Sequence, residues 1–265
     1  MKTFFVDSFT DQKFKGNPAA VCITEQALDI STMQNIATEI GFSETAFIQH
    51  LSGNKYSIRF FTPKKEIPLC GHATLAASKI IFDSTDLEAI TFQNIEQVEL
   101  PIEKAGDDIL MQFPVYDTVE ANVPQVMLDA LGISKLLNTR YSPKNKIILI
   151  EIESADTLAD LQPDFTALVQ SYNGINGVLV TSASNIADFD FHYRYFWPWA
   201  GTNEDPVTGG VQTFLTKYWA KKLGKTSLKA FQSSARTGKM RTELKDNKVL
   251  IFGKAVTVLE GELKS

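Results

Sequence analysis

Short apolar runs bounded by turn residues predict that the chain opens with a series of strands. The runs Thr3 to Phe9 and Ala19 to Thr24 flank a turn at Lys15-Gly16-Asn17-Pro18, so a hairpin-like start is expected. Further strands are predicted at Thr45 to Gln49, at Tyr56 to Phe61, near Ile90 and Val98, and at Ile109 to Phe113.

Two helices are predicted among these strands. Apolar residues at helical spacing predict a helix over Ser31 to Ile40, capped by Asp29 or Ser31 and ended by Gly41. A second helix, from Gly71 to about Phe82, is apolar on most sides, which suits a helix buried inside a curled sheet. The first half is therefore predicted to be a mixed barrel around a helix.

One motif occurs twice. In each copy an aromatic strand ends at a proline, a loop follows, and a glycine opens an apolar run spaced like a helix. The copies are Arg59-Phe60-Phe61-Thr62-Pro63 followed by Glu66 and Gly71, and Arg194-Tyr195-Phe196-Trp197-Pro198 followed by Glu204, Gly209 and Gly210. Either copy alone would be ordinary loop punctuation, but two in matching order favour a duplicated strand-to-helix turn.

The second half is predicted to repeat the plan of the first. Its expected elements are a strand at Lys146 to Glu151, helical sequence from Ser154 to Val169, strands at Val178 to Thr181 and Phe189 to Trp197, and a helix through Val211 to Lys222. The stretch from Pro114 to Pro124 has no clear periodicity, so we expect domains at 1–116 and 117–265, with the last strand able to return to the first.

A weaker match extends the repeat upstream. It aligns Gly41-Phe42-Ser43-Glu44 with Gly174-Ile175-Asn176-Gly177. The first half therefore offers a carboxylate where the second offers a glycine.

Composition narrows the classes of protein. The chain has 265 residues, 44% of them hydrophobic and 22% charged, which is ordinary for a globular protein that buries a substantial core. Its net charge of −5 argues against nucleic acid as a partner. Cys22 and Cys70 form no CxxC pair, which favours a reducing cytoplasm, and neither a signal leader nor a membrane-spanning run is expected.

Three side chains are candidates for proton transfer. Glu44 lies at a helix-to-strand turn, His72 follows Gly71 at a helix start, and Asp205 lies in the sister loop. The plainer alternatives are a surface glutamate, a capping or core histidine, and an aspartate that forms a turn before proline. Two helix N-termini facing one cleft would hold an anionic small molecule such as a carboxylate.

Other chemistries are less favoured. Cys70 at a helix start invites a nucleophilic role with a lowered pKa, but a two-thiol racemase needs a second thiol where the repeat has Thr208. His50, His72 and His192 have no partner at metal-ligand spacing, so no metal is expected. No P-loop or GxGxxG occurs, and no cofactor is expected.

The ordered motifs resemble the phenazine-biosynthesis PhzF-like isomerase family. They are Val6-Asp7-Ser8-Phe9-Thr10, Gly16-Asn17-Pro18-Ala19-Ala20-Val21, Ser43-Glu44-Thr45-Ala46-Phe47, Cys70-Gly71-His72-Ala73-Thr74 and Glu204-Asp205-Pro206-Val207-Thr208-Gly209. The resemblance implies an α+β, diaminopimelate-epimerase-like fold of two pseudo-repeated barrel-like domains, each around a central helix, with the active site between them. It also implies a homodimer.

The resemblance also implies roles for single residues. Glu44 matches the family's general acid/base, His72 and Asp205 match its supporting residues, and the amides of Gly71, His72, Gly209 and Gly210 match its carboxylate-binding donors. Two departures affect the substrate: Gly210 replaces a usual serine, and Gln232 to Gly238 lacks the usual glycine-rich form.

The function expected from the sequence is a cofactor-independent isomerase that shifts a proton between carbons of a small carboxylate-bearing metabolite. An epimerase or racemase of a small acid, and a non-catalytic carboxylate binder, are the alternatives. The substrate itself is not specified by the sequence.

Overall fold

A computed structural model describes residues 1–264, and the chain in it divides into two compact units. The first unit contains Met1–Phe113 together with the chain from Leu250 onward, and the second contains Pro114–Val249. The C-terminal strand β18 (Ala255–Glu262) belongs to the first unit because it pairs antiparallel with β1 (Lys2–Ser8).

The other elements of the first unit follow in chain order. They are β2 (Asn17–Ile23), α1 (Ile30–Ile40), β3 (Thr45–Ser52), β4 (Lys55–Phe61), β5 (Glu66–Ile67), α2 (Gly71–Ser84), β6 (Ala89–Gln93), β7 (Glu99–Ala105) and β8 (Asp108–Pro114). The predicted hairpin is present, since β1 and β2 are antiparallel with Ser8 opposite Asn17. Strand β2 then runs parallel to β3, β3 antiparallel to β4, and β4 parallel to β6.

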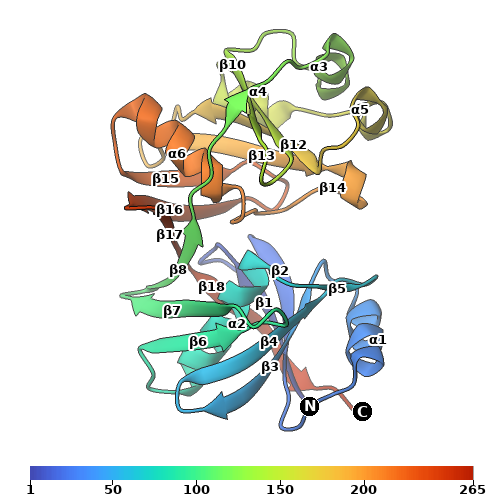
Figure 1. Cartoon of the computed structure of the whole chain (residues 1–265), viewed down its shortest axis with the longest axis vertical. Helices are drawn as coiled ribbons and strands as arrows, with labels where there is room; N and C mark the ends of the chain where they lie inside the picture. The colour runs from blue at the N-terminus through green and yellow to red at the C-terminus, as the bar shows by residue number, and fades with distance from the viewer. Residues whose placement is uncertain (265) are drawn as a thin grey trace. The chain divides into compact units, whose positions relative to one another are not determined.

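Helix α2 is the centre of the first unit. Ten of its residues are buried, from His72 to Phe82, and it packs against β1, β2, β3 and β18. Figure 1 shows it among the strands of this unit. The predicted buried central helix is confirmed. Its sequence is apolar on nearly every side because strands surround it.

The second unit has its own set of elements. They are β9 (Val119–Glu120), α3 (Gln125–Leu131), β10 (Asn138–Ser142), β11 (Ile147–Glu151), α4 (Ala155–Asp160), α5 (Phe165–Ser171), β12 (Gly177–Ala183), β13 (Phe191–Trp197), the 3₁₀ turn η1 (Pro198–Ala200), β14 (Thr202–Glu204), α6 (Gln212–Leu223), β15 (Ser227–Gln232) and β16 (Gly238–Lys245). Strand β17 (Lys248–Gly253) leads from this unit into the first.

The strands of the second unit pair in the same sequence as those of the first. Strands β10 and β11 are antiparallel, β11 is parallel to β12, β12 is antiparallel to β13, and β13 is parallel to β15. The registers also correspond, because Thr45 faces Phe61 in one unit and Val178 faces Phe196 in the other. The motif found twice in the sequence is therefore part of a duplicated fold.

An arginine–glutamate pair recurs at the same place in both units. Arg59 on β4 makes two hydrogen bonds of 2.7 Å to Glu66 on β5. Arg194 on β13 does the same to Glu204 on β14, at 2.7 and 2.8 Å. Planar bidentate pairs of this kind fix the short return strand to its neighbour. The Arg and the Glu that the two motifs share thus have a structural reason.

Three details of the second unit differ from the sequence-based expectation. The helical sequence from 154 to 169 forms two helices, α4 and α5, because Pro163 interrupts it. Helix α3 and strand β10 were not predicted. Helix α6 begins at Gln212, after Gly209 and Gly210, so the glycines form a turn before the helix rather than its first residues.

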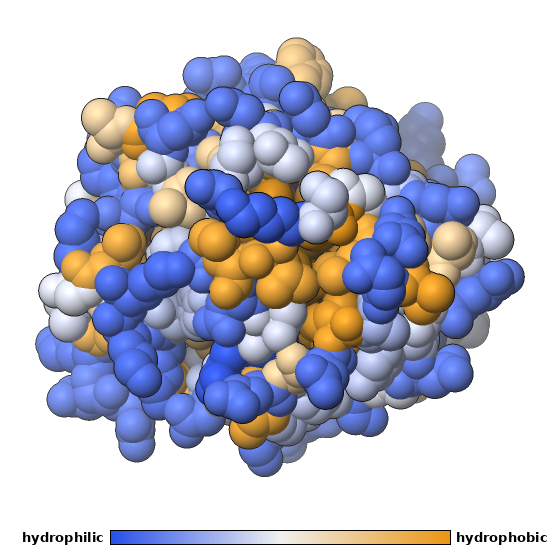
Figure 2. Space-filling model, turned by 90° about the horizontal axis from the view of Figure 1, so that it is seen from above, coloured by the Kyte–Doolittle hydropathy of each residue, from blue (hydrophilic) through white to orange (hydrophobic). Residues whose placement is uncertain are grey.

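The core of the second unit lies between its small helices and its strands. Residues of α3, α4 and α5 pack on β11, β12 and β13, with Leu158, Leu168 and Val178 fully buried. On the face seen in Figure 2, polar side chains interrupt the apolar patches. Such a mixed surface is normal for globular proteins. Within residues 1–264 no helix has the length and hydrophobicity needed to cross a membrane.

Candidate functional site

Glu44 is buried at the junction of α1 and β3. Gly41 ends α1 with a φ of 73° and its N–H donates to the carbonyl of Ala37. This left-handed residue, which glycine adopts at low cost, turns the chain toward β3. The Glu44 side chain is only 6% exposed, and its Oε2 lies 3.2 Å from Nε2 of His72. The surface-glutamate alternative is therefore excluded.

His72, the second residue of α2, is held on several sides. On the side away from Glu44, its Nδ1 lies 3.2 Å from Nδ2 of Asn17 and 3.5 Å from Sγ of Cys70. Its carbonyl accepts a 2.7 Å hydrogen bond from the Ser8 hydroxyl. Both partners from the first hairpin are fully buried, so the imidazole has a fixed orientation toward the carboxylate.

The pair of Glu44 and His72 is polarised. Burial opposes ionisation of Glu44, but the hydrogen bond and charge of His72, with the Ser43 hydroxyl, lower the pKa of Glu44 overall. Burial likewise opposes the imidazolium, but contacts with Cys70 and Glu44 raise the pKa of His72 well above its ordinary value. Burial raises the pKa of Cys70, so its thiol is neutral at pH 7 and Glu44 supplies the negative charge.

Stability of the first unit should depend on pH through this pair. The lowered pKa of Glu44 gives stability that is lost as pH falls below about 4.5, and the raised pKa of His72 gives stability that is full below about pH 6.5 and lost as pH rises through the folded-state value. Between these pH values we expect the free energy of unfolding of wild type to exceed that of Glu44→Gln by about 1–2 kcal/mol, the difference between a charge-assisted and a neutral hydrogen bond, and by less outside them. Urea unfolding followed by circular dichroism measures the difference, and a pH-independent gap would contradict the assignment.

Cys70 does not have the lowered pKa that its place before a helix suggested. It is 8% exposed, and desolvation outweighs the favourable charge of His72. Cys22 is also buried, with its pKa raised to about 11. Neither thiol has the properties of an activated nucleophile.

The fold brings together a possible ligand set that sequence spacing did not reveal. One ligand atom each from Glu44, Cys70 and His72 lies within 4.8 Å of the others. Oxygen, sulfur and nitrogen donors of this kind suit a divalent cation such as zinc. Sequence spacing did not reveal these neighbours of His72, and the expectation that no metal binds stays a prediction.

The start of α2 offers N–H donors beside the pair. The first hydrogen bond within the helix runs from the N–H of Thr74 to the carbonyl of Cys70. The preceding N–H groups, including those of Gly71 and His72, have no acceptor within the helix and lie at its positive end. An anion next to His72 would contact these N–H donors and lie at the positive end of the helix.

Asp205 is buried in a loop of the second unit that other side chains hold firmly. Its carboxylate accepts a short hydrogen bond from the Thr208 hydroxyl, and its N–H donates to the carbonyl of Tyr195 at 3.1 Å. Gln232 donates to the carbonyl of Asp205 at 2.5 Å and accepts from the N–H of Thr208 at 2.7 Å. Gln232 therefore supports this loop.

Gly209 and Gly210 precede α6 as a turn. The N–H groups of Gln212 and Thr213 donate to the carbonyls of Gly209 and Gly210, at 3.0 and 3.4 Å. The first N–H groups of α6 already have hydrogen-bond acceptors, so the candidate donors for an anion are the N–H groups of the turn itself. The expected donors in the second unit are therefore not helical residues.

In the second unit, Gly177 occupies the position that corresponds to Glu44 in the first unit. A Cβ atom there would lie 2.6 Å from the carbonyl oxygen of Phe196 and 2.7 Å from the Tyr195 ring. No side chain fits without moving the backbone of β13. At this position of the repeat, packing as well as sequence thus limits a carboxylate to the first unit.

Several contacts of the site were missed from the sequence. Ser8 and Asn17 were quoted within motifs but given no role, and Ser43 and Gln232 were not considered as partners. The available signal was the position of a polar residue at the end of an apolar strand, as for Ser8 and Asn17 on β1 and β2. Their burial could not be derived from that signal alone.

Comparison with known proteins gives the class of fold and then the family. The duplicated α+β plan matches the diaminopimelate-epimerase-like fold: a probable proline racemase from Agrobacterium radiobacter, 11% identical, superposes with a TM-score of 0.61 over 99% of this chain and 92% of that one. A crystal structure of a phenazine biosynthesis protein of the PhzF family from Enterococcus faecalis is 36% identical, with a TM-score of 0.93 over 100% and 99% of the two chains.

The family model for phenazine biosynthesis-like proteins matches residues 6–261. An uncharacterized isomerase of Halalkalibacterium halodurans is 42% identical over 98% of this chain and 97% of its own. The chain therefore belongs to the phenazine biosynthesis-like, or PhzF-like, family, as its motifs indicated.

Proposed function

We propose that the protein is a cofactor-independent isomerase that moves a proton between two carbons of a small carboxylate-bearing metabolite. The observation that carries this proposal is the buried carboxylate of Glu44, 3.2 Å from His72 at the N-terminus of α2. The isomerase name of the 42% identical relative supports the reaction class.

Glu44 acts as base and then as acid. Its lowered pKa keeps it ionised at neutral pH, ready to take a proton from an activated C–H bond. The electron pair moves toward the substrate's carboxylate or carbonyl, where the N–H groups at the start of α2 stabilise the charge. Each such donor is commonly worth about 3–4 kcal/mol. Glu44 then returns the proton to a different carbon on the same face.

His72 and Asp205 have supporting roles in this proposal. His72 orients Glu44 and stabilises its carboxylate by hydrogen bonding and charge. Asp205 is held in place by Thr208 and Gln232. As the family resemblance implies, it holds or relays a proton at the heteroatoms of the substrate. Gly71, Gly209 and Gly210 provide backbone donors for the substrate carboxylate.

An epimerase that uses Cys70 is the second candidate. Its Sγ lies 3.5 Å from Nδ1 of His72, and the fold is shared with a probable proline racemase. The neutral, buried thiol weakens this candidate. A carboxylate binder without catalysis is the third.

Incubation with a metabolite extract in D2O tests the proposal. We expect a carboxylic acid to appear as a positional isomer carrying deuterium at the new C–H bond, as read by mass spectrometry and NMR. Exchange with inversion at one carbon, lost in Cys70→Ala, would instead establish the epimerase. Ligand binding with no exchange into any compound would establish the binder.

A further inference from the structure

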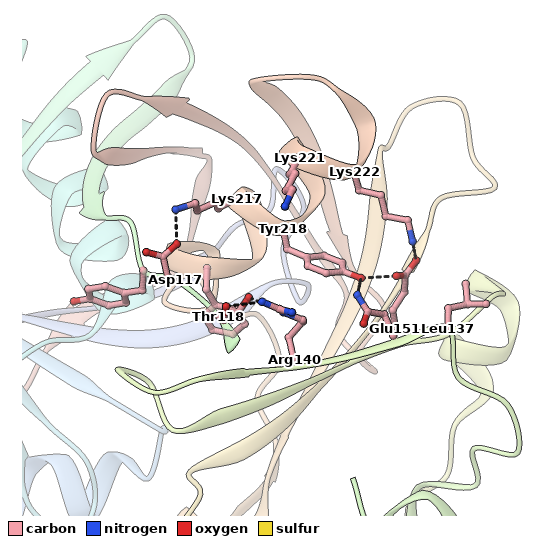
Figure 3. A pocket seen from close by; sticks show the side chains of 12 residues that line it. Asp117, Thr118, Leu137, Arg140, Glu151, Lys217, Tyr218, Lys221 and Lys222 are labelled. Carbon is pink, nitrogen blue, oxygen red and sulfur yellow. Dashed lines mark hydrogen bonds and ion pairs between the residues drawn. The ribbon is translucent and has the colours of Figure 1, made fainter. Parts of the chain in front are cut away.

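A cavity of about 500 Å³ lies within the second unit, between α6 and strands β10 and β11. We call it the basic cavity because its lining includes Arg140, Lys217, Lys221 and Lys222 against two acids, Asp117 and Glu151. None of these residues belongs to the site described above. Figure 3 shows their side chains around the cavity.

Two of the four cations are neutralised within the basic cavity. Lys217 pairs with Asp117 at 2.5 Å, and Lys222 makes a short ion pair with Glu151. Among the described residues Arg140 instead donates only to neutral acceptors, the hydroxyl and carbonyl of Thr118, at 3.2 and 2.6 Å. Lys221 has no hydrogen-bond or ion-pair partner among residues 1–264. Two positive charges therefore remain without a carboxylate.

The wall of the basic cavity is ordered by hydrogen bonds. Glu151 on β11 is 1% exposed and accepts a 2.5 Å hydrogen bond from the Tyr218 hydroxyl, which accepts one of 3.0 Å from Asn138. Thr118 fixes the guanidinium of Arg140 from one side. Figure 3 shows the Lys221 side chain directed from α6 into the space above Arg140. Both unneutralised cations thus line this one cavity, Lys221 from α6 and Arg140 from β10.

The local charge runs against that of the whole chain. The protein carries a net charge of −5, yet this cavity has a surplus of positive charge. Its volume is within the range of roughly 300–1,000 Å³ that is typical of sites for small molecules. Arginine and lysine are the side chains that bind phosphate and carboxylate groups.

We propose that the basic cavity is a second ligand site, which binds a small multivalent oxyanion through Arg140 and Lys221. The shared chemistry is two or more negative charges on oxygen, supplied by a phosphate ester or by a polycarboxylate. Asp117 and Glu151 keep their lysine partners when the ligand binds. The site is independent of the function proposed for Glu44.

Isothermal titration at low ionic strength tests the proposal with pyrophosphate and citrate as probes, one for each source of charge. We expect at least one probe to bind, and Lys221→Gln and Arg140→Gln each to weaken it by about 10-fold or more, since hydrogen bonds to charged groups contribute this much. The probe that binds more tightly identifies the source. Low salt matters because ions screen exposed charges.

Lys64→Gln is the matched control, because Lys64 is an exposed lysine of the first unit and its loss changes net charge equally. Glu44→Gln separates this site from the proposed catalytic one, and it should bind the probe like wild type. The proposal is overturned if neither probe binds at millimolar concentration, if Lys221→Gln binds like wild type, or if Lys64→Gln weakens binding as much.

Discussion

Glu44→Gln is expected to slow deuterium incorporation into the substrate by about 10²–10⁴-fold, the usual contribution of a general acid/base. Glutamine keeps the size of the side chain and its hydrogen bond to His72, but it cannot accept a proton at neutral pH. The rate of exchange in D2O, measured by mass spectrometry on the compound found with wild type, gives the effect.

The control for this variant is Glu39→Gln, the same change at an exposed position of α1. It should exchange deuterium at the wild-type rate. Equal rates for Glu44→Gln and wild type, with circular dichroism showing an intact fold, would remove Glu44 from the mechanism. A loss in both variants would point to a general effect of charge on substrate capture.

Glu204→Leu is expected to destabilise the second unit by about 3–5 kcal/mol, the usual cost of removing one partner of a buried ion pair. Arg194 is only 8% exposed at its side chain, and the lost carboxylate accepts from both its Nε and Nη2. In the variant, Nη1 of Arg194 still donates hydrogen bonds to the carbonyls of Leu158, Ala159 and Leu161. These neutral acceptors hold the guanidinium in place without neutralising its charge.

Urea unfolding followed by tryptophan fluorescence reports this effect selectively, because all three tryptophans belong to the second unit. Glu153→Leu is the matched control, since its pair with Lys135 is exposed and should contribute about 1 kcal/mol or less. The double change Arg194→Met with Glu204→Leu should recover part of the loss. A cost for Glu204→Leu no greater than that for Glu153→Leu would contradict the assigned role.

The duplicated architecture was accessible from the sequence because its signals are local. Proline, glycine and aromatic residues repeat in order around Arg59 and Arg194, and the apolar surface of α2 reflects burial on all sides. These signals predicted the duplicated plan and the buried helix, whereas the family and its fold were correctly predicted from the resemblance of the ordered motifs. Pro163 was a local signal too, and reading it as a helix breaker would have separated α4 from α5.

The contacts of the site were beyond local pattern. Glu44 contacts His72, which lies 28 positions further along the chain, because the fold brings the start of β3 next to the start of α2. Asn17 on β2 and Cys70 before α2 contact the same imidazole. The same holds for the basic cavity, where Arg140 and Lys221 come from a strand and a helix far apart in sequence. Long-range pairing of this kind depends on register and packing, which single-sequence periodicity does not contain.

The crowding at Gly177 has a stereochemical consequence. Because the carbonyl of Phe196 and the ring of Tyr195 exclude any side chain there, a counterpart of Glu44 cannot arise at this position by a point substitution. In the proposed reaction Glu44 then has no duplicate in the second unit at this position, and deuterium that Glu44 alone delivers should give a labelled product that is a single enantiomer at that carbon.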